Sequence, residues 1–295
     1  MEPFVPLGHF WEEERTDGGT LPTLTVFLAG AECPFTCIYC DLWRRTLEGP
    51  TPPGALPAQL HQALEVETVP PSAAVKLYNA SNFFDPRAVP PADEPALLEL
   101  LRPFVRVTVE SHPRLVGRHC LEFASRLEGR LEVALGLETV HPEALPRLNK
   151  QMTLADFDRA ARVLRCAGIP IRAFVLVGAP FVAREEAVYW AVCSAEYAYQ
   201  RGAGRVSLIP VRGGNGALEV LDRDGKFFPP CLGQLEEAFE RTLELEGGIA
   251  QVDLWDAHLF ASCAACSTAR IERLARMNLT GQPEPRPGCP ACGWS

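Results

Sequence analysis

The sequence has 295 residues, of which 47% are hydrophobic and 22% are charged. This length suits one α/β domain with an appendage, and the composition excludes a mostly disordered or collagen-like chain. The formal net charge of −9 argues against a generic nucleic-acid binder. No apolar run reaches the roughly 20 residues of a membrane helix, and the acidic N-terminus is unlike a signal peptide. We therefore expect a cytoplasmic protein that does not bind a membrane.

Six short apolar runs alternate with helix-like segments over most of the chain. These runs cover residues 23–30, 73–80, 106–111, 131–138, 171–178 and 204–211. Such runs are typical of strands that are covered on both faces of a parallel sheet. Helical periodicity marks the segments 95–104, 153–168 and 183–202, and we expect Thr153 to cap the second of these and Gly168 to end it. Six successive βα units predict either a partial barrel or a doubly wound sheet, with ligands at the carboxyl ends of the strands.

The pattern changes after the sixth run. Residues 212–230 read as a loop, and residues 232–247 read as a further helix before a cysteine-rich tail. We therefore divide the chain into an N-terminal arm (1–20), a core (21–213) and a C-terminal extension (214–295).

Eleven cysteines need an explanation, because an odd number in a cytoplasmic-looking chain points to metal binding or catalysis rather than to disulfides. Seven of them fall into two groups, one near the start of the core and one in the tail. The other four stand alone in apolar stretches, where we expect small core residues. They are Cys120, Cys166, Cys193 and Cys231.

The first group, Cys33, Cys37 and Cys40, follows the first predicted strand as CPFTCIYC. Three thiolates in one loop can hold three irons of a [4Fe-4S] cluster and leave the fourth iron open to another ligand. A structural zinc site would need a fourth protein ligand, for which His61 is a weak candidate. The position at the carboxyl end of a strand favours the catalytic interpretation.

These residues resemble the radical S-adenosylmethionine (SAM) superfamily, whose hallmark is a CxxxCxxC loop after the first strand of a partial (β/α)6 TIM-like barrel. Tyr39, an aromatic residue before the last cysteine of the loop, also fits. The resemblance implies a [4Fe-4S] cluster that binds SAM at its unique iron. One electron, from a flavodoxin-type or ferredoxin-type donor, then cleaves SAM to methionine and a 5′-deoxyadenosyl radical.

The same resemblance places SAM contacts at the ends of the later strands. Asn79, Ser81 and Asn82 stand where relatives carry a glycine-rich motif, although the glycines are missing here. Glu110 and Glu138 could accept hydrogen bonds from ribose hydroxyls or an ammonium group, or could form salt bridges at the rim. The backbone of Val177 and Gly178 would lie near the adenine, or would only form a turn before a helix. The resemblance assigns no catalytic residue beyond these cluster and SAM ligands.

Longer segments resemble one branch of the superfamily. They include KLYNASNFFDPRAVP, VTVESHP, ALGLETVHPEALPRLNKQMTLADF and FVLVGAPF. The branch is related to the Elongator catalytic subunit and includes the radical lyase subunit of archaeosine synthase. It implies an enzyme of lyase or transferase type that modifies a tRNA nucleoside. Two alternatives stay open, namely the same chemistry on a small metabolite or peptide, and a non-catalytic zinc protein.

The second group consists of two CxxC pairs separated by 22 residues, Cys263 and Cys266 followed by Cys289 and Cys292. This spacing predicts a metal site, with zinc as the commoner occupant and an auxiliary iron–sulfur cluster as the alternative.

Between the two pairs, residues 267–278 read as a helix with Ser267 as a plausible cap. Arg270, Arg273 and Arg276 recur on one face of this helix. They form either a stripe that contacts tRNA phosphates or an ordinary solvated face.

Overall fold

The structure is a computed structural model that describes residues 1–65 and 68–293. Its strands are β1 (Gly8–Thr16), β2 (Gly19–Leu28), β3 (Ala74–Asn79), β4 (Arg106–Ser111), β5 (Arg130–Glu138), β6 (Ile171–Val177), β7 (Arg205–Pro210) and β8 (Ile249–Val252). Its α-helices are α1 (Ala55–Glu65), α2 (Glu94–Leu101), α3 (Arg118–Arg126), α4 (Ala144–Arg147), α5 (Leu154–Cys166), α6 (Ala187–Gln200), α7 (Ala217–Arg223), α8 (Leu232–Leu243) and α9 (Ala264–Thr280). Short 3-10 helices cover Leu42–Arg45, Pro91–Asp93, Pro113–Leu115, Arg184–Glu186 and Ala257–Phe260.

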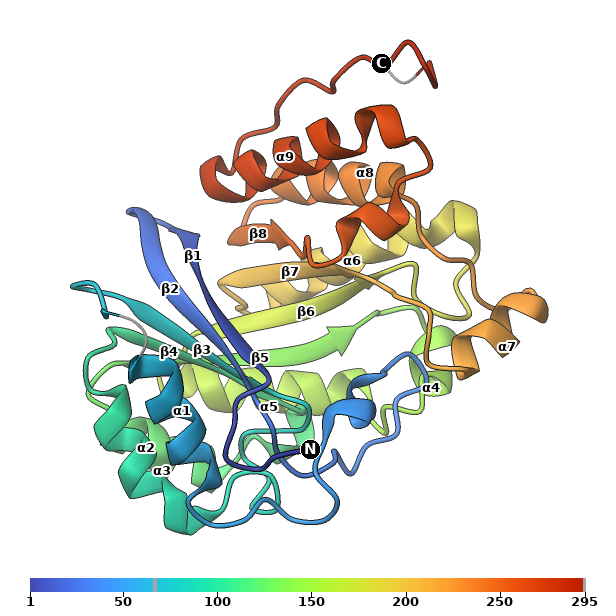
Figure 1. Ribbon diagram of the computed structural model, residues 1–295. Coiled ribbons are helices and arrows are strands. Elements are labelled where there is room, and N and C mark those ends of the chain that lie inside the picture. The colour runs from blue at the N-terminus through green and yellow to red at the C-terminus, as the bar shows by residue number, and fades with distance from the viewer. Residues whose placement is uncertain (66–67, 294–295) are drawn as a thin grey trace.

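The strands form one curved sheet in the order β1 to β8, which is nearly a closed barrel (Figure 1). The six predicted strands correspond to β2–β7, which are parallel, so the predicted barrel with a cysteine-rich extension is confirmed. The helices lie outside this sheet, with α1, α2 and α3 beside β2–β4 and with α8 and α9 over β7 and β8. None of the helices that the structure describes is long and apolar enough to span a bilayer.

The sheet extends beyond the predicted core at both edges. β1 pairs antiparallel with β2, and β8 pairs parallel with β7. The N-terminal arm therefore contributes a strand, as does the C-terminal extension. The division of the chain at residues 20 and 213 stays a prediction.

Three local predictions are wrong. Residues 212–230 contain α7, and α9 begins at Ala264 with Cys263 as its N-cap, so Ser267 lies inside the helix. Cys166 and Cys231 are exposed, so they are not core residues. The cap at Thr153 is confirmed, since its hydroxyl accepts a hydrogen bond from the Asp156 backbone N–H while the Asp156 carboxylate accepts one from Thr153.

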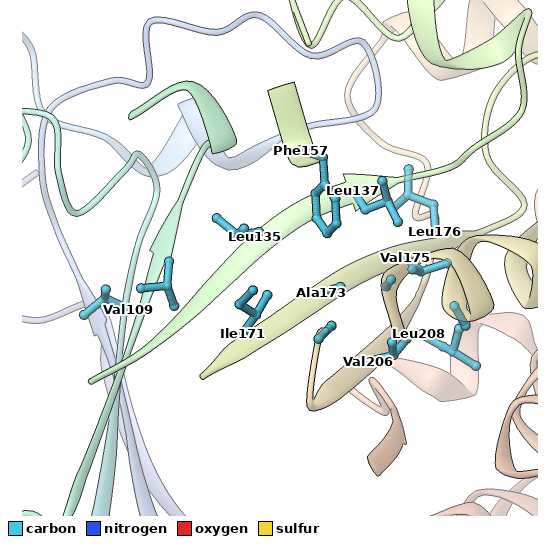
Figure 2. Packing of buried hydrophobic residues seen from close by; sticks show 14 of the residues in the cluster. Val109, Leu135, Leu137, Phe157, Ile171, Ala173, Val175, Leu176, Val206 and Leu208 are labelled. Atoms are coloured by element: carbon cyan, nitrogen blue, oxygen red, sulfur yellow. The ribbon is translucent and has the colours of Figure 1, made fainter. Parts of the chain in front are cut away.

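The hydrophobic core lies between the outer face of the sheet and the helices. Figure 2 shows Phe157 of α5 beside Leu137 of β5, with Ala173 and Val175 of β6 nearby. Since these outward positions alternate with inward ones along each strand, the helices bury every second residue. The inward-facing positions are not part of this core, so they can carry charged and polar side chains.

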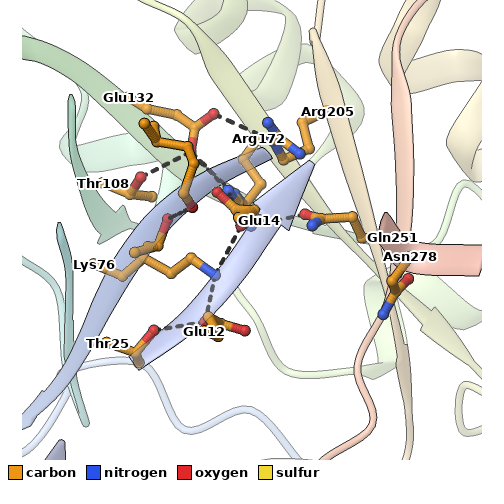
Figure 3. Close-up of polar contacts among 12 residues, drawn as sticks. Glu12, Glu14, Thr25, Lys76, Thr108, Glu132, Arg172, Arg205, Gln251 and Asn278 are labelled. Atoms are coloured by element: carbon orange, nitrogen blue, oxygen red, sulfur yellow. Dashed lines mark hydrogen bonds and ion pairs between the residues drawn. The ribbon is translucent and has the colours of Figure 1, made fainter. Parts of the chain in front are cut away.

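A layer of charged side chains fills the amino-terminal end of the barrel (Figure 3). Glu14 of β1 is almost fully buried and contacts Lys76 Nζ at 2.8 Å, Arg172 Nη2 at 2.8 Å and Arg106. Arg172 also donates to Glu132 Oε2 at 3.0 Å. Burial by itself would raise the pKa of Glu14, but the charge of Arg172 and the other cations hold it well below its usual range. Glu14 is therefore ionised and joins β1 to the opposite wall of the barrel.

An aromatic layer lies above these charges. Phe27 of β2 contacts Tyr78 of β3 with 6.3 Å between ring centroids, and Tyr78 contacts Phe174 of β6 edge-on at 6.3 Å. These rings separate the charged floor from the carboxyl ends of the strands.

We expect Glu14→Ala to lower the free energy of unfolding by about 3–5 kcal/mol, because it leaves several buried cations without their carboxylate. Glu13→Ala is the matched control, since Glu13 is exposed on the same strand and its loss should cost less than about 0.5 kcal/mol. Urea unfolding measures both values. Equal, small losses in the two variants would show that the charged layer does not hold the barrel together.

Candidate active site

The loop that follows β2 carries the first cysteine group and is held by side-chain amides from distant segments. The Gln59 side chain accepts from the Ala29 N–H at 2.8 Å and donates to the Ala29 carbonyl at 2.9 Å. Asn149 Nδ2 donates to the Thr36 carbonyl at 2.9 Å, and Asn215 Nδ2 donates to the Ile38 carbonyl at 2.7 Å. These hydrogen bonds fix the position of the loop at the carboxyl end of the barrel.

The three cysteines of this loop are half-buried. Cys33 Sγ accepts hydrogen bonds from Asn82 Nδ2 at 3.2 Å and from the Phe35 N–H at 3.5 Å. Burial raises the pKa of the Cys33 and Cys37 thiols and raises that of Cys40 to about 12. Without a metal the thiols are therefore protonated, and binding a cluster releases their protons.

A buried ion pair lies above the end of β5. Glu138 Oε1 and Lys150 Nζ are 2.8 Å apart, and both side chains are more than 90% buried. Burial by itself would lower the pKa of Lys150, but the Glu138 carboxylate raises it, so Lys150 stays charged. Tyr39 lies beside the pair, and burial followed by the charges of Glu138 and Cys37 raises the pKa of its hydroxyl.

The backbone around this ion pair is strained and closely packed. Glu138 has φ of 68°, a left-handed conformation that is uncommon outside glycine, and the pairing of β5 with β6 shifts register between Gly136 and Glu138. A Cβ at Gly136 would overlap Glu138 Oε1 and lie 2.5 Å from Lys150 Nζ. Gly136 therefore leaves the space that the ion pair occupies. Backbone strain of this kind is characteristic of functional sites.

Glu110 at the end of β4 is a second carboxyl group in the same region. It forms no side-chain hydrogen bond with the described residues, and burial raises its pKa to about 8 despite the opposing charge of Lys150. Near neutral pH this side chain is thus mainly protonated, and a cation beside it would displace the proton.

Unpartnered polar atoms lie at the end of β3. Asn79 is almost fully buried, and among the described residues neither its Nδ2 nor its Oδ1 has a hydrogen-bond partner. Ser81 Oγ is likewise buried without a partner. Because unsatisfied buried polar groups are costly, such atoms indicate a place where a polar ligand binds. Asn82 differs from both, because its amide already contacts Cys33 and the His112 N–H.

The end of β6 is tightly packed. Gly178 has φ of 75°, and a Cβ there would lie 2.9–3.1 Å from the ring of Pro230. The Val177 carbonyl accepts a hydrogen bond from the Val211 N–H at 3.1 Å. Glycine is therefore required at position 178 for local packing as well as for any role toward a ligand.

The tail cysteines come together as the spacing predicts. The Sγ atoms of Cys263, Cys266, Cys289 and Cys292 all lie within 4.8 Å of one another, with 3.9 Å between the first and third and 3.8 Å between the second and fourth. Four thiolates about 2.3 Å from one tetrahedral zinc ion would have edges of about 3.8 Å. The two separations given above are close to this value. A cubane cluster places four irons between its ligands and would hold the sulfurs further apart.

Neither prediction for the arginines of α9, a stripe that contacts phosphates or a solvated face, fits the structure, because two of the three side chains are buried. Arg270 and Arg273 are 3% and 2% exposed. Arg270 Nη2 donates to Glu236 Oε2 at 2.6 Å, and Arg273 donates to the Glu284 carbonyl at 2.8 Å. Arg276 is exposed, but it pairs with the Glu284 carboxylate at 2.9 Å. These arginines bind groups of their own chain, because α8 presents the buried Glu236 to Arg270 and the segment after α9 presents Glu284 to the other two.

Several known structures share this fold. The chain superposes on an archaeal Elp3 from Methanocaldococcus infernus with a TM-score of 0.54 and 13% identity, covering 86% of this chain and 63% of that one. Methylornithine synthase gives a TM-score of 0.54 and 13% identity over 88% and 83% of the two chains. A radical SAM methyltransferase from Sphaerobacter thermophilus gives 0.52 and 15% over 86% and 77%. The chain therefore shares the fold of these three proteins, the last of which is named as a radical SAM methyltransferase.

Sequence comparison identifies more specific relatives than the comparison of structures. No protein-family model matches the chain. An uncharacterized protein of Methanocaldococcus jannaschii is 25% identical, and the match covers 70% of this chain but only 60% of that relative. Archaeosine synthase subunit beta of Methanosarcina acetivorans is 24% identical over 94% of this chain and 84% of that relative. The same subunit from Thermococcus kodakarensis is 27% identical over 43% and 41%. The predicted resemblance to archaeosine synthase subunit beta is confirmed.

Lys150 is the main site residue that the sequence patterns did not indicate. It lies after α4, away from any strand end, in the segment LNKQ. Asn149 and Gln151 on either side of it both have positive φ, so an irregular turn carries its side chain back to Glu138. A single lysine in an irregular turn forms no sequence motif with the other site residues, so spacing could not reveal it.

We expect Gly136→Ala to lower the free energy of unfolding by about 1–3 kcal/mol, because the new methyl group must displace the Glu138–Lys150 pair. Gly204→Ala is the matched control, since a Cβ at Gly204 meets no atom of residues 1–65 and 68–293 within 4 Å. Chemical denaturation compares the two. A Gly136→Ala variant as stable as the control would show that the pair does not need this space.

Proposed function

We propose that this chain is a radical SAM enzyme in which Cys33, Cys37 and Cys40 hold a [4Fe-4S] cluster. The observation that carries the proposal is the three-thiol loop at the carboxyl end of β2, next to the end of β3, where buried polar groups lack partners among the described residues. The donor set fits, because three thiolates leave one iron for an external ligand. Bound together and given one electron, the cluster and SAM supply a 5′-deoxyadenosyl radical.

The residues around the loop match the polar groups of SAM. Asn79 and Ser81 offer uncharged donors and acceptors that have no other partner within the described part of the chain. Glu110 offers a carboxyl group that loses its proton when the ammonium of SAM arrives, and Lys150 offers a fixed positive charge for the SAM carboxylate. Glu138 orients Lys150 and accepts hydrogen bonds from ribose hydroxyls.

The remaining contacts enclose the site. We place the adenine against the backbone of Val177 and Gly178 at the end of β6, and Tyr39 beside Glu138. The aromatic layer beneath the site excludes water, which protects a reactive carbon radical from side reactions. A one-electron donor of the flavodoxin or ferredoxin type completes the requirements.

The tail belongs to a separate structural site in this proposal. The edges of its sulfur tetrahedron favour one zinc ion over an auxiliary cluster. Arg270 lies next to Cys266 and interacts with it, so it balances part of the negative charge of four thiolates. Zinc here fastens the C-terminal segment to α9.

A tRNA nucleoside is the substrate class that we infer. The support is the likeness to archaeosine synthase subunit beta, which spans most of this chain in one relative. The paired arginines of α9 give this inference no support. The same chemistry on a small metabolite or peptide is the competing substrate class, and a zinc protein without catalysis is the competing function.

Metal content tests the core of the proposal. We expect about four irons and four sulfides with one zinc per chain in protein purified without oxygen, and 5′-deoxyadenosine after reduction in the presence of SAM. The combined Cys33→Ala, Cys37→Ala and Cys40→Ala variant should lose the iron and keep the zinc. The combined Cys289→Ala and Cys292→Ala variant should lose the zinc and keep the iron.

Two outcomes of the metal analysis contradict parts of the proposal. Zinc without iron after anaerobic reconstitution would contradict the radical mechanism and favour the non-catalytic alternative. About eight irons without zinc would contradict the single-ion tail and assign a second cluster to it.

Binding of tRNA tests the substrate class. We expect total tRNA to bind the holoenzyme at 50 mM salt. Raising the salt from 50 to 200 mM should lower the affinity about threefold for each phosphate contact. Filter binding or fluorescence anisotropy measures the slope. If tRNA does not bind at low salt while reduction still cleaves SAM, the substrate is a smaller molecule.

A further inference from the structure

Asn82 lies between the cysteine loop and the end of β4. Its Nδ2 is 3.2 Å from Cys33 Sγ, and its Oδ1 accepts a hydrogen bond from the His112 N–H at 2.6 Å. The side chain is 95% buried, so water does not compete for either contact. Both ends of one amide are thus used, one on a thiol and one on the backbone.

The orientation of this amide follows from its partners. A backbone N–H only donates, so it must face the carbonyl oxygen of Asn82 and not the NH2 group. The NH2 group then points at Cys33 and donates to the sulfur. His112 reinforces this arrangement, because its ring stacks on Phe35 of the same loop with 3.7 Å between centroids and 12° between planes.

His112 is itself held in place on both sides. Its Nδ1 accepts from the Arg114 N–H at 3.1 Å, and its Nε2 is 2.9 Å from the Lys150 carbonyl. The backbone N–H that orients Asn82 therefore belongs to a rigid residue. Cys33 and its amide donor have a fixed geometry before any cofactor arrives.

We propose that Asn82 is a positioning residue that raises the reduction potential of the cluster by donating a hydrogen bond to the Cys33 sulfur. This inference rests on the proposed function, because it needs a cluster on Cys33. A hydrogen-bond donor places positive charge beside the sulfur and so stabilises the extra electron of the reduced cluster. Asn82 thereby acts through a ligand of the cluster and does not contact SAM.

The experiment compares changes of similar size at Asn82 and at a second asparagine that donates hydrogen bonds to the cysteine loop. Asn82→Asp retains the acceptor for the His112 N–H and removes the donor to Cys33. Asn149→Asp is the matched control, because Asn149 donates to the Thr36 carbonyl and hydroxyl of the same loop at 2.9 and 2.8 Å. Asp tolerates the positive φ of position 149. Asn82→Leu removes the donor without adding charge.

The readouts are the midpoint potential of the reconstituted cluster, followed by EPR during reductive titration, and the affinity for SAM. We expect both Asn82 variants to shift the potential to more negative values, with the control close to wild type and SAM affinity retained. If Asn82→Leu does not fold, Asn82→Asp against Asn149→Asp still decides.

Each other outcome has a definite meaning. Equal potentials in Asn82→Asp and wild type would overturn the inference, as would an equal shift in the control. Loss of SAM affinity at an unchanged potential would make Asn82 a SAM contact instead. A wild-type protein that assembles no cluster would overturn the proposed function, whereas a cluster that does not respond to Asn82 overturns this inference alone.

Discussion

The buried carboxylate of Glu14 is the interaction on which the barrel depends. It stands on the antiparallel strand β1 and binds cations from β3, β4 and β6. Within the described residues, β1 and β8 do not pair as strands, so side chains rather than backbone hydrogen bonds close this end of the barrel. Arg172 completes the closure, because it reaches Glu14 on one side and Gln251 of β8 on the other. Closing one end with charge leaves the other end available for chemistry.

The same arrangement explains how much of the fold could be predicted. The strands β2–β7 carry apolar residues on their outward faces, which produced recognisable runs. β1 reads GHFWEEERT, and its inward glutamates make it look like a polar arm. Its partners lie far along the chain, so no local pattern shows that these charges are buried. β8 has only four residues, too few for a periodic signal.

The candidate site likewise contains features that the sequence could predict and features that it could not. The spacing of the cysteines is local, and it predicted the three-thiol loop and the tail tetrahedron. The roles of Asn82 and Lys150 depend on contacts between different loops at the carboxyl end of the barrel, which the spacing of residues does not encode. The arginines of α9 show the opposite error, since a regular repeat suggested an exposed stripe. Glu236 of α8 is fully buried beneath Arg270, and this partner decides their environment.

Helix α9 lies against both edges of the sheet, and this position affects solubility. An uncovered edge strand presents free N–H and C=O groups that can pair with another molecule. Asn278 of α9 occupies such groups on β8, because its amide accepts from the Val252 N–H and donates to the Val252 carbonyl, both at 2.9 Å. The same helix contacts β1 at the opposite edge. The cysteine-rich extension therefore shields the open seam of the barrel against strand addition and aggregation, whichever metal its thiols hold.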